Sequence, residues 1–451
     1  MRHSSRSIFR FWAPLAATWL MMAAEGPFLA AVIARLPDPK FNLAAHGVAF
    51  AFAILVEAPV IMLMSASTAL VEDSVSYRRL RNFANALNFG STVLLLVVLV
   101  PPIYDALLRT VIGLPDEVAD LTYGALWLFL PWPAAIGVRR FLQGVMIRSG
   151  RTRLVAAGTV IRLLAMASTA TALFTASSLP GAWVGAASLS AGVLAEALAA
   201  WWMAAGSVRE ILSGSATSAA GGTDSFGDRS MAVGLDYRRI AGFYFPLALT
   251  SLIGLTVQPL LTFFMGRAPA PIESLAVFPV VHALSFIFRS LGLSFQDAAI
   301  ALLGRRHEHF PELSRFAACL GLAASAGLAA IAFTPLATVW FETVSGLTPD
   351  LASFAVLPTR LLVPVPALSV LLSFERAILM QGRRTRPITV ATAIEVLVIA
   401  LLFVLGGWVV GLVGVTAAFL AFLGGRIGST GYLAVRSRSV LRSSKSAADS
   451  R

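Results

Sequence analysis

The sequence has few of the residues from which disulfide frameworks and metal centres are built. Of its 451 residues only 13% are charged, five are histidine and one, Cys319, is cysteine. A single cysteine excludes an intramolecular disulfide. The histidines are scattered, and none of their spacings is typical of a metal site. The sequence therefore predicts neither a disulfide-stabilised fold nor a bound metal.

Phosphate-binding loops are missing as well. The chain contains no GxxxxGK[ST] run, the loop that holds the phosphates of a nucleotide in many ATPases. The short loops between its apolar segments carry no acidic pair that would hold a metal–nucleotide. We therefore expect a protein that is not an enzyme, uses no cofactor and does not hydrolyse ATP, so that any energy it needs comes from an ion gradient.

Apolar side chains are abundant instead. Hydrophobic residues make up 57% of the chain, and its mean hydropathy is +0.80, far from the balance of a soluble globular protein. Long, nearly uncharged segments recur, each able to cross the roughly 30 Å hydrocarbon layer as a helix. They are residues 11–34, 43–71, 85–108, 120–147, 154–176, 181–206, 239–265, 274–303, 315–338, 350–380, 388–405 and 409–435. We predict an all-α polytopic membrane protein with twelve transmembrane helices.

The two halves of the chain repeat each other. Residues 11–39 align without a gap on residues 243–271, and residues 129–153 align on residues 362–386. The matched positions include residues that apolar composition alone does not explain: Pro14 and Pro246, Pro27 and Pro259, Arg35 and Arg267, Pro131 and Pro364, and Pro133 and Pro366. Duplication in a membrane protein is typical of transporters.

The repeat predicts the domain organisation. We expect an N-lobe of six helices at residues 1–206, a Gly/Ser-rich cytoplasmic linker at residues 207–238, a C-lobe of six helices at residues 239–435 and a disordered cytoplasmic tail at residues 436–451. Six helices return the chain to its starting side, so both lobes have the same orientation. They should form parallel repeats around a central cleft.

The basic residues predict the orientation in the membrane. Most of the 35 Lys and Arg fall in segments that are cytoplasmic if the N-terminus is cytoplasmic, and few fall in the outside loops. Those few are Arg35, Lys40, Arg109 and Arg267. This bias predicts a multi-pass protein of the cell (inner or plasma) membrane with both termini in the cytoplasm. The net charge of +12 then indicates contact with anionic membrane lipids rather than with nucleic acid.

Thirteen charged side chains lie inside the predicted spans, where each is costly if it faces lipid. The arginines are Arg139, Arg140, Arg162, Arg289, Arg360, Arg376 and Arg426, and the acids are Glu25, Glu57, Glu196, Asp297, Glu375 and Glu395. Most must face a polar cleft or pair with one another. Because the arginine fork suits phosphate and carboxylate, we interpret Arg139, Arg140, Gln143, Arg289, Arg360 and Arg376 as substrate-binding residues. Glu196 and Arg426 are interpreted as structural.

The remaining charges suggest coupling or gating roles. Under the repeat, Glu57 corresponds to Arg289, and Arg162 corresponds to Glu395. Opposite charges at equal depth could pair between the lobes in a closed state, and the alternative is a partner within each lobe, such as Asp297 for Arg289. Glu25 and its counterpart, Gln258, lie beside Pro27 and Pro259. A proline leaves a backbone carbonyl of the helix without its hydrogen bond, which favours an ion site or a hinge at these positions. We place Glu375 in the same group.

Several runs resemble a known family. They are LAAHGVAF at residues 43–50 followed by Pro59, FYFPLAL at residues 243–249, FMGR ending at Arg267, and LPTRLLVPVP at residues 357–366 with the basic turn QGRRTR. With the twelve-helix repeat, the chain resembles the multidrug/oligosaccharidyl-lipid/polysaccharide (MOP) exporter superfamily, and within it the progressive ankylosis (ANK) family. Arg360 lies within one of the matching runs.

The resemblance implies a secondary active transporter that exports small multivalent anions such as pyrophosphate, ATP or citrate, with a proton or sodium ion as a possible coupling partner. Two alternatives stay open. A cation-coupled multidrug exporter would depend on Glu25 and Glu57 and tolerate loss of the arginines. A flippase for a lipid-linked pyrophosphate sugar would also need a cationic cleft, and it would depend on a lipid carrier.

Overall fold

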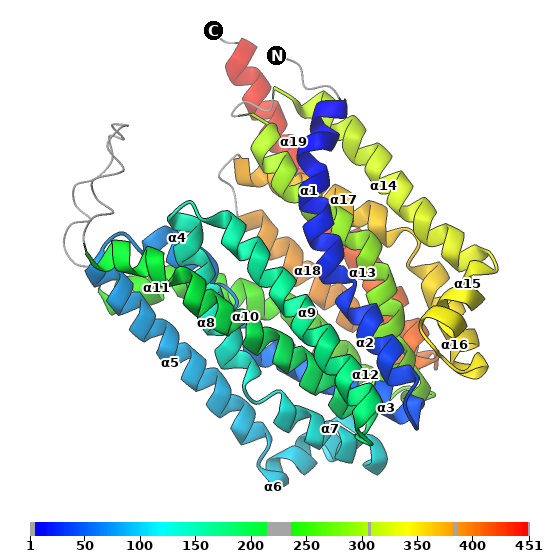
Figure 1. The fold of residues 1–451 in the computed structure, drawn as a ribbon. Helices are drawn as coiled ribbons and strands as arrows, with labels where there is room; N and C mark the ends of the chain where they lie inside the picture. Colours follow the sequence, from blue (N-terminus) through cyan, green and yellow to red (C-terminus); the bar gives the residue numbers. More distant parts are fainter. Residues whose placement is uncertain (1–4, 214–235, 305–307, 382–385, 450–451) are drawn as a thin grey trace. The chain divides into compact units, whose positions relative to one another are not determined.

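The protein is built from helices. The computed structural model describes residues 5–213, 236–304, 308–381 and 386–449, and no β-strand occurs among them (Figure 1). The first-half helices are α1 (Ser5–Ala23), α2 (Glu25–Ala34), α3 (Pro39–Glu57), α4 (Leu63–Leu70), α5 (Ser74–Val98), α6 (Pro101–Tyr104), the π-helix η1 (Asp105–Ile112), α7 (Asp116–Leu128), α8 (Trp132–Arg148), α9 (Thr152–Ala176) and α10 (Gly181–Leu212). A helical backbone satisfies its own hydrogen bonds, as the hydrocarbon layer requires.

The second half follows the same order. Its helices are α11 (Tyr237–Leu255), α12 (Val257–Gly266), α13 (Pro271–Leu302), α14 (Phe310–Phe333), α15 (Leu336–Thr338), the π-helix η4 (Val339–Val344), α16 (Pro349–Leu361), α17 (Val365–Gln381), α18 (Arg386–Phe403), the π-helix η5 (Val404–Val409) and α19 (Gly414–Asp449). Within the described ranges, ten helices are long and apolar enough to cross a membrane, or up to twelve if two bent pairs each count as one span. This confirms the predicted all-α polytopic class, with ten to twelve candidate spans.

The helix that carries the third predicted span begins before that span. The span is predicted from residue 85, and α5 begins at Ser74 and carries Arg78, Arg79 and Arg81 in its first turns. The cause is a capping box, in which the Asp73 side chain accepts from the Ser76 backbone at 2.7 Å and the Ser76 hydroxyl accepts from the Asp73 backbone at 2.9 Å. The bond from the Ser76 backbone also lowers the pKa of Asp73, as it stabilises the carboxylate that caps the helix.

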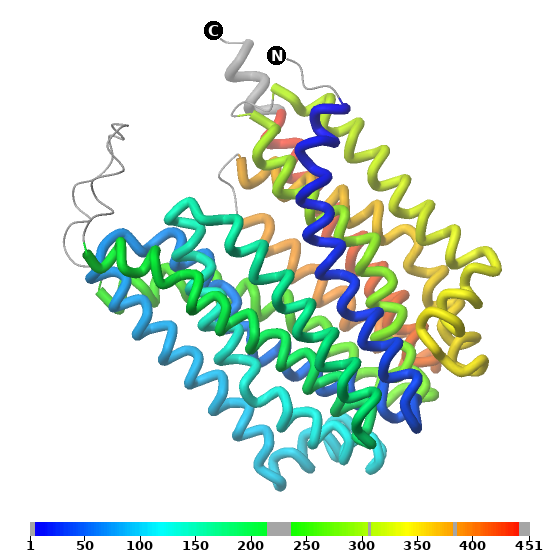
Figure 2. The backbone as a smooth tube through the Cα atoms, viewed as in Figure 1, coloured from blue at the N-terminus to red at the C-terminus, as the bar shows by residue number. Residues whose placement is uncertain are grey.

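Proline breaks the first helix of each repeat at the same place. Helix α1 gives way to α2 at Ala24, and α11 gives way to α12 at Thr256. Figure 2 shows the path of α1 and α2 as the dark-blue part of the tube. Pro27 and Pro259 follow each break by three residues. A proline has no N–H to donate to the carbonyl four residues earlier, and its ring crowds that carbonyl. The predicted irregularity beside Glu25 and Gln258 is thus confirmed.

Backbone conformations repeat as well. Asp38 and Ala270, each placed between two prolines, occupy equal positions in the repeat and both have φ of 52°. A non-glycine residue in this left-handed region is uncommon. Gly113 and Gly346, with φ of 80° and 74°, follow the π-helices η1 and η4. The duplication thus extends to single strained residues that composition does not explain.

The contacts group the chain into two compact units. Unit 1 comprises residues 1–48, 111–118 and 257–451, and unit 2 comprises residues 49–110 and 119–256. Helices α1 and α2 of the first repeat therefore pack mainly on the second repeat, and α11 of the second repeat packs on the first, whereas α12 stays with its own repeat. In unit 1, Trp12 of α1 donates to the Ser294 hydroxyl of α13 at 2.8 Å. In unit 2, the equivalent Tyr244 of α11 donates to the Pro59 carbonyl and packs on Phe83.

Two arginines, which follow α2 and α12, also contact the opposite repeat. In unit 1, Arg35 donates to the carbonyls of Thr343 and Val344 at 2.6 and 3.1 Å, three and two residues before Gly346. Its counterpart Arg267 packs against Gly113, where an added Cβ would lie 3.7 Å from the arginine side chain. Each arginine thus holds the loop of the other repeat, which explains why residues 111–118 belong to unit 1.

These contacts divide the chain differently from the predicted lobes at residues 1–206 and 239–435. As bodies that move during a functional cycle, those lobes stay a prediction. Of the predicted linker, residues 207–212 continue α10, α11 begins at Tyr237, and residues 214–235 lie outside the described residues. The predicted disordered tail differs too, because α19 continues to Asp449. No proline or glycine interrupts this segment, and Val440 is buried in the core of unit 1.

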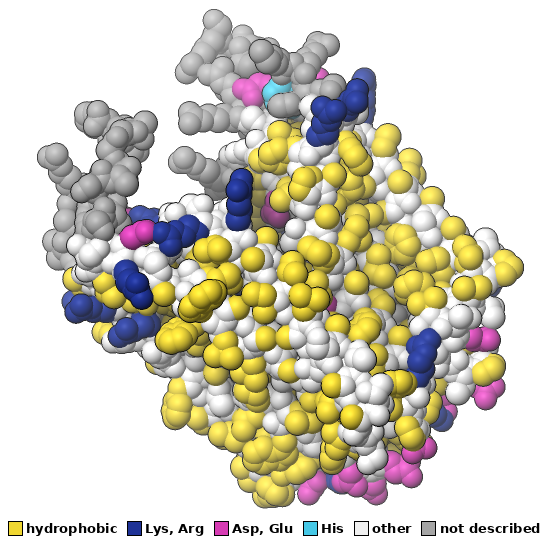
Figure 3. Space-filling view, viewed as in Figure 1, with side chains coloured by type: hydrophobic (Ala, Val, Ile, Leu, Met, Phe, Trp, Pro, Cys, Tyr) yellow, Lys and Arg dark blue, Asp and Glu magenta, His cyan; other side chains and the backbone are white. Residues whose placement is uncertain are grey.

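Large apolar side chains cover much of the surface. Figure 3 shows one face on which hydrophobic groups dominate. In unit 2, α10 exposes Leu198, Trp201 and Trp202 by 67–78%, and in unit 1, α18 exposes Leu397 and Leu401 by 69% and 59%. Such a surface is costly in water and suited to lipid. The exposure of these helices therefore agrees with a multi-pass membrane protein.

Two serines at opposite ends of α10 test the orientation. Ser178 precedes the helix, Ser213 ends it, and both are exposed. In a Cys319→Ser background, Ser178→Cys should react with a membrane-impermeant maleimide on intact cells, because the positive-inside rule places it outside. Ser213→Cys should react only after permeabilisation. The reverse pattern would overturn the predicted orientation, and equal labelling would show that α10 does not span.

Candidate functional site

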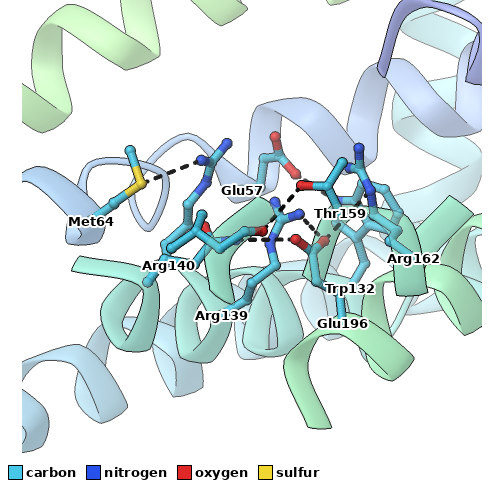
Figure 4. A network of polar contacts seen from close by, with 10 residues as sticks. Glu57, Met64, Trp132, Arg139, Arg140, Thr159, Arg162 and Glu196 are labelled. Atoms are coloured by element: carbon cyan, nitrogen blue, oxygen red, sulfur yellow. Dashed lines mark hydrogen bonds and ion pairs between the residues drawn. The ribbon is translucent and has the colours of Figure 1, made fainter. Parts of the chain in front are cut away.

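In unit 2, the end of α3 and the helices α8, α9 and α10 bring together a buried group of charges, which we call the first cluster. Its members are Glu57, Arg139, Arg140, Arg162 and Glu196 (Figure 4). Three arginines meet two carboxylates, so the cluster carries one excess positive charge. Four of these five residues are predicted site residues, and two of them, Arg139 and Arg162, contact Glu196, which the sequence analysis interprets as structural.

Glu196 is the centre of the first cluster. Its side chain is 1% exposed, and its Oε2 accepts from Arg139 Nη1 and lies 3.5 Å from Arg162 Nε. Its Oε1 accepts from Gln143 Nε2 at 3.0 Å. Gly192 permits this arrangement, because a Cβ there would lie 3.0 Å from the Arg162 carbonyl and hold α9 away from α10. One carboxylate therefore orders donors from two other helices.

Glu57 and Arg140 occupy the other side of the first cluster. Glu57 is the last residue of α3, and its Oε2 accepts from Trp132 Nε1 at 2.6 Å. Pro131 and Pro133 flank this tryptophan at the start of α8 and fix where that helix begins. Arg140 points away from Glu196 toward the Met64 sulfur, 3.9 Å away (Figure 4). A thioether is a weak acceptor, so Arg140 is the guanidinium of this cluster best placed to bind an anion.

Unit 1 contains a more positive group, which we call the second cluster, formed by Arg289, Arg376, Glu395 and Arg426. Arg426 Nη2 lies 3.0 Å from Glu395 Oε1. The guanidinium groups of Arg289 and Arg426 stack on the Phe422 ring, 4.8 and 5.3 Å from its centroid. Arg376 lies within electrostatic range of Arg426 and Glu395. Three arginines meet one carboxylate, which leaves two excess positive charges.

The arginines of the second cluster retain hydrogen-bonding capacity. The Nε atoms of Arg289, Arg376 and Arg426 are buried, and none has a hydrogen-bond partner within the described part of the chain. Arg289 Nη1 lies 3.4 Å from His282 Nε2. Depending on the tautomer, this nitrogen either accepts a hydrogen bond from the arginine or is itself a donor. Buried donors without acceptors are costly. The cluster is therefore chemically complementary to a multivalent anion.

The two clusters are related by the repeat with their charges reversed. In unit 2 the arginine, Arg162, lies on α9 and the carboxylate, Glu196, lies on α10. In unit 1 the carboxylate, Glu395, lies on the equivalent α18 and the arginine, Arg426, lies on the equivalent α19. The sequence analysis predicts that Arg162 and Glu395 form an ion pair between the lobes. The structure instead gives each a partner in its own unit, which was the alternative, and pairing in another state stays a hypothesis.

Other predicted site residues lie elsewhere. Arg360 is exposed, donates from Nε to the Ala332 carbonyl at 3.1 Å and stacks on Phe333, so the structure does not bring it to the second cluster. Asp297 accepts from Trp19 rather than pairing with Arg289. Glu25 is the first residue of α2 and Gln258 is the second residue of α12, and their coupling role stays a prediction.

Removing Glu196 should destabilise the protein. Glu196→Ala leaves Arg139 and Arg162 buried without their carboxylate, and we expect a loss of about 3 kcal/mol in the free energy of unfolding. Leu198→Ala on the same helix is a matched control, because Leu198 is 67% exposed, and should change stability by about 0.5 kcal/mol or less. Thermal unfolding of the purified proteins measures both. Equal stability of the two variants would contradict the central role of Glu196.

Comparisons with known proteins bear on the fold. No protein-family model matches the chain, and no curated protein sequence matches it. Among solved structures, a multidrug resistance transporter of the MATE family in the MOP superfamily, in an inward-facing conformation, is similar with a TM-score of 0.66 and 15% identity over 95% of this chain and 96% of that chain. The lipid II flippase MurJ is similar with a TM-score of 0.64 and 12% identity over 96% and 90%.

A third similar structure is a MOP-superfamily transporter from Pyrococcus furiosus, described as having a binding pocket of reversed polarity. Its TM-score is 0.59, with 15% identity over 98% of this chain and 97% of that chain. The narrower resemblance to the ANK family stays a prediction. At these identities the similarity concerns architecture: the chain has the fold shared by MATE transporters and the flippase MurJ.

Proposed function

We propose that the protein is a secondary active transporter that exports small multivalent anions by alternating access, in which two lobes move relative to each other around a binding site near the bilayer midplane. The excess of buried arginine over carboxylate in the second cluster carries this proposal. Arg289 and Arg376 have stacking or electrostatic neighbours but no carboxylate ligand in the described ion pairs. An anion would neutralise charges that the protein itself leaves unpaired.

Pyrophosphate, ATP and citrate are the ligand class that this chemistry fits. Each presents several anionic oxygens, and a guanidinium donates two parallel hydrogen bonds to such a group. The first cluster adds Arg140, whose guanidinium donates to the Met64 sulfur. The similarity to MATE and MurJ transporters supports a transport function, and the cell membrane with both termini in the cytoplasm is the proposed location. A coupling proton or sodium ion would act at carboxylates such as Glu25 or Glu57.

A second candidate is a flippase for a lipid-linked pyrophosphate sugar. The similarity to MurJ, described as a lipid II flippase, favours it, and a pyrophosphate headgroup would meet the same arginines. A cation-coupled multidrug exporter is the third. It is the reading that the MATE neighbours suggest, but the net charge of both clusters disfavours a cationic cargo because like charges repel.

Neutralising single arginines tests the anion proposal. We expect Arg289→Gln and Arg376→Gln to reduce efflux of radiolabelled pyrophosphate or citrate from proteoliposomes about tenfold or more, the effect of losing one charge-assisted hydrogen bond. Neither substitution orphans a carboxylate, so folding should be preserved. Arg360→Gln is the matched control, because Arg360 contacts a backbone carbonyl outside the cluster.

Three outcomes separate the candidates. Efflux that falls in both cluster variants but not in Arg360→Gln supports anion export. The absence of efflux for any anion, together with translocation of a lipid-linked pyrophosphate sugar that depends on Arg289, favours the flippase. Efflux that is unaffected in Arg289→Gln and Arg376→Gln would refute the role assigned to the second cluster.

A further inference from the structure

Unit 1 contains a cavity that the proposed function does not use. It lies between α14, α17 and α19 and has a volume of about 550 Å³. Its walls are mainly apolar and include the stacked rings of Phe310 and Phe374, whose centroids are 5.5 Å apart. A cavity of this size accommodates part of a drug-sized or lipid-sized molecule.

One ionisable group is buried in this cavity. Glu375 of α17 is 3% exposed, and its Oε2 has no hydrogen-bond partner among the described residues. It precedes Arg376 of the second cluster by one residue, so the two side chains leave the helix about 100° apart. An unpartnered buried carboxylate is costly. A ligand that donates a hydrogen bond to this oxygen would remove that cost.

A charge of the opposite sign lies at the same cavity. Arg438 of α19 lines it, is exposed, and lies within electrostatic range of Glu375. A ligand with only a positive charge would be attracted by Glu375 and repelled by Arg438. A ligand with only a negative charge would be repelled by Glu375 and attracted by Arg438. A ligand that carries both a positive and a negative group is complementary to the pair.

The cavity also borders the lipid-facing surface. Leu322 of α14 and Leu371 of α17 line it and are 70% and 43% exposed. The cavity begins at Phe310, the first residue of α14, and extends along that helix to Leu322. Its polar group Glu375 lies six residues before the end of α17, so the cavity reaches from the depth of lipid headgroups into the acyl region. Its apolar wall is thus continuous with the surface that acyl chains cover.

We propose that this cavity binds a bilayer phospholipid whose headgroup carries a primary ammonium, with the ammonium at Glu375, the phosphate at Arg438 and the acyl chains along Leu322 and Leu371. The buried carboxylate oxygen selects the primary ammonium, because it needs an N–H donor and a choline headgroup has none. This inference is independent of the proposed anion transport, since it uses none of the residues of the two clusters.

Lipid binding by the purified full chain tests the proposal. Native mass spectrometry would compare phosphatidylethanolamine and phosphatidylcholine with identical acyl chains. The unchanged protein should bind phosphatidylethanolamine about tenfold more tightly, because only its headgroup donates to the carboxylate. Glu375→Gln should reduce this ratio to about one. Arg438→Gln should weaken both lipids to a similar extent, because they share the phosphate, and Arg436→Gln is its control, as Arg436 lies outside the cavity and stacks on Tyr432.

A second pair of variants keeps the test decisive if Glu375→Gln does not fold. Ala318 is exposed and lines the cavity, whereas Cys319 is exposed and does not. Ala318→Trp should fill the cavity and reduce phosphatidylethanolamine binding about tenfold, and Cys319→Trp should leave it unchanged. Equal affinity of the unchanged protein for both lipids, a preference that persists in Glu375→Gln, or equal effects of the two tryptophans would overturn the proposal.

Discussion

The structure depends on how charge is neutralised inside an apolar helical bundle. An ionised side chain in the hydrocarbon layer needs a counter-charge within reach, because water is not available to solvate it. Glu196 meets this requirement for α8, α9 and α10 at once, and Arg426 with Glu395 meets it for α18 and α19. These ion pairs fix which faces of the helices meet. The arginines left over are then held in place without being neutralised, which is the state that an anion-binding site requires.

Much of the fold could be predicted from the sequence, because hydropathy and proline positions are local signals. The spans follow from the apolar segments, and Pro27 and Pro259 break the first helix of each repeat as expected. The exchange of first helices between the repeats could not be predicted in this way. It depends on long-range contacts, such as those of Trp12 with Ser294 and of Arg35 with Thr343, and one sequence carries no direct record of them.

The site was only partly predictable, since a charge in a span does not reveal which way its side chain faces. Arg139 and Arg140 are neighbours in sequence, yet they leave the helix about 100° apart, and only Arg139 reaches Glu196. Arg360 lies in the predicted basic region but contacts a backbone carbonyl instead. Glu196 and Arg426 seemed unrelated in the sequence because they are not at equal positions in the repeat. Only the packing of their helices shows that they are equivalent partners.

The reversed charges of the two repeats limit how the duplicated halves can be interchanged. If α18 were replaced by its counterpart α9, Arg162 would be placed beside Arg426, and two guanidinium groups would meet where an ion pair had been. The reciprocal exchange would bring Glu395 beside Glu196. The helical hairpin formed by α9 and α10 contains both Arg162 and Glu196. These two charges therefore stay together wherever the hairpin is placed. Because Glu196 also pairs with Arg139 of α8, the smallest module of the first repeat that keeps all of these ion pairs is the three helices α8, α9 and α10, half of its six-helix repeat.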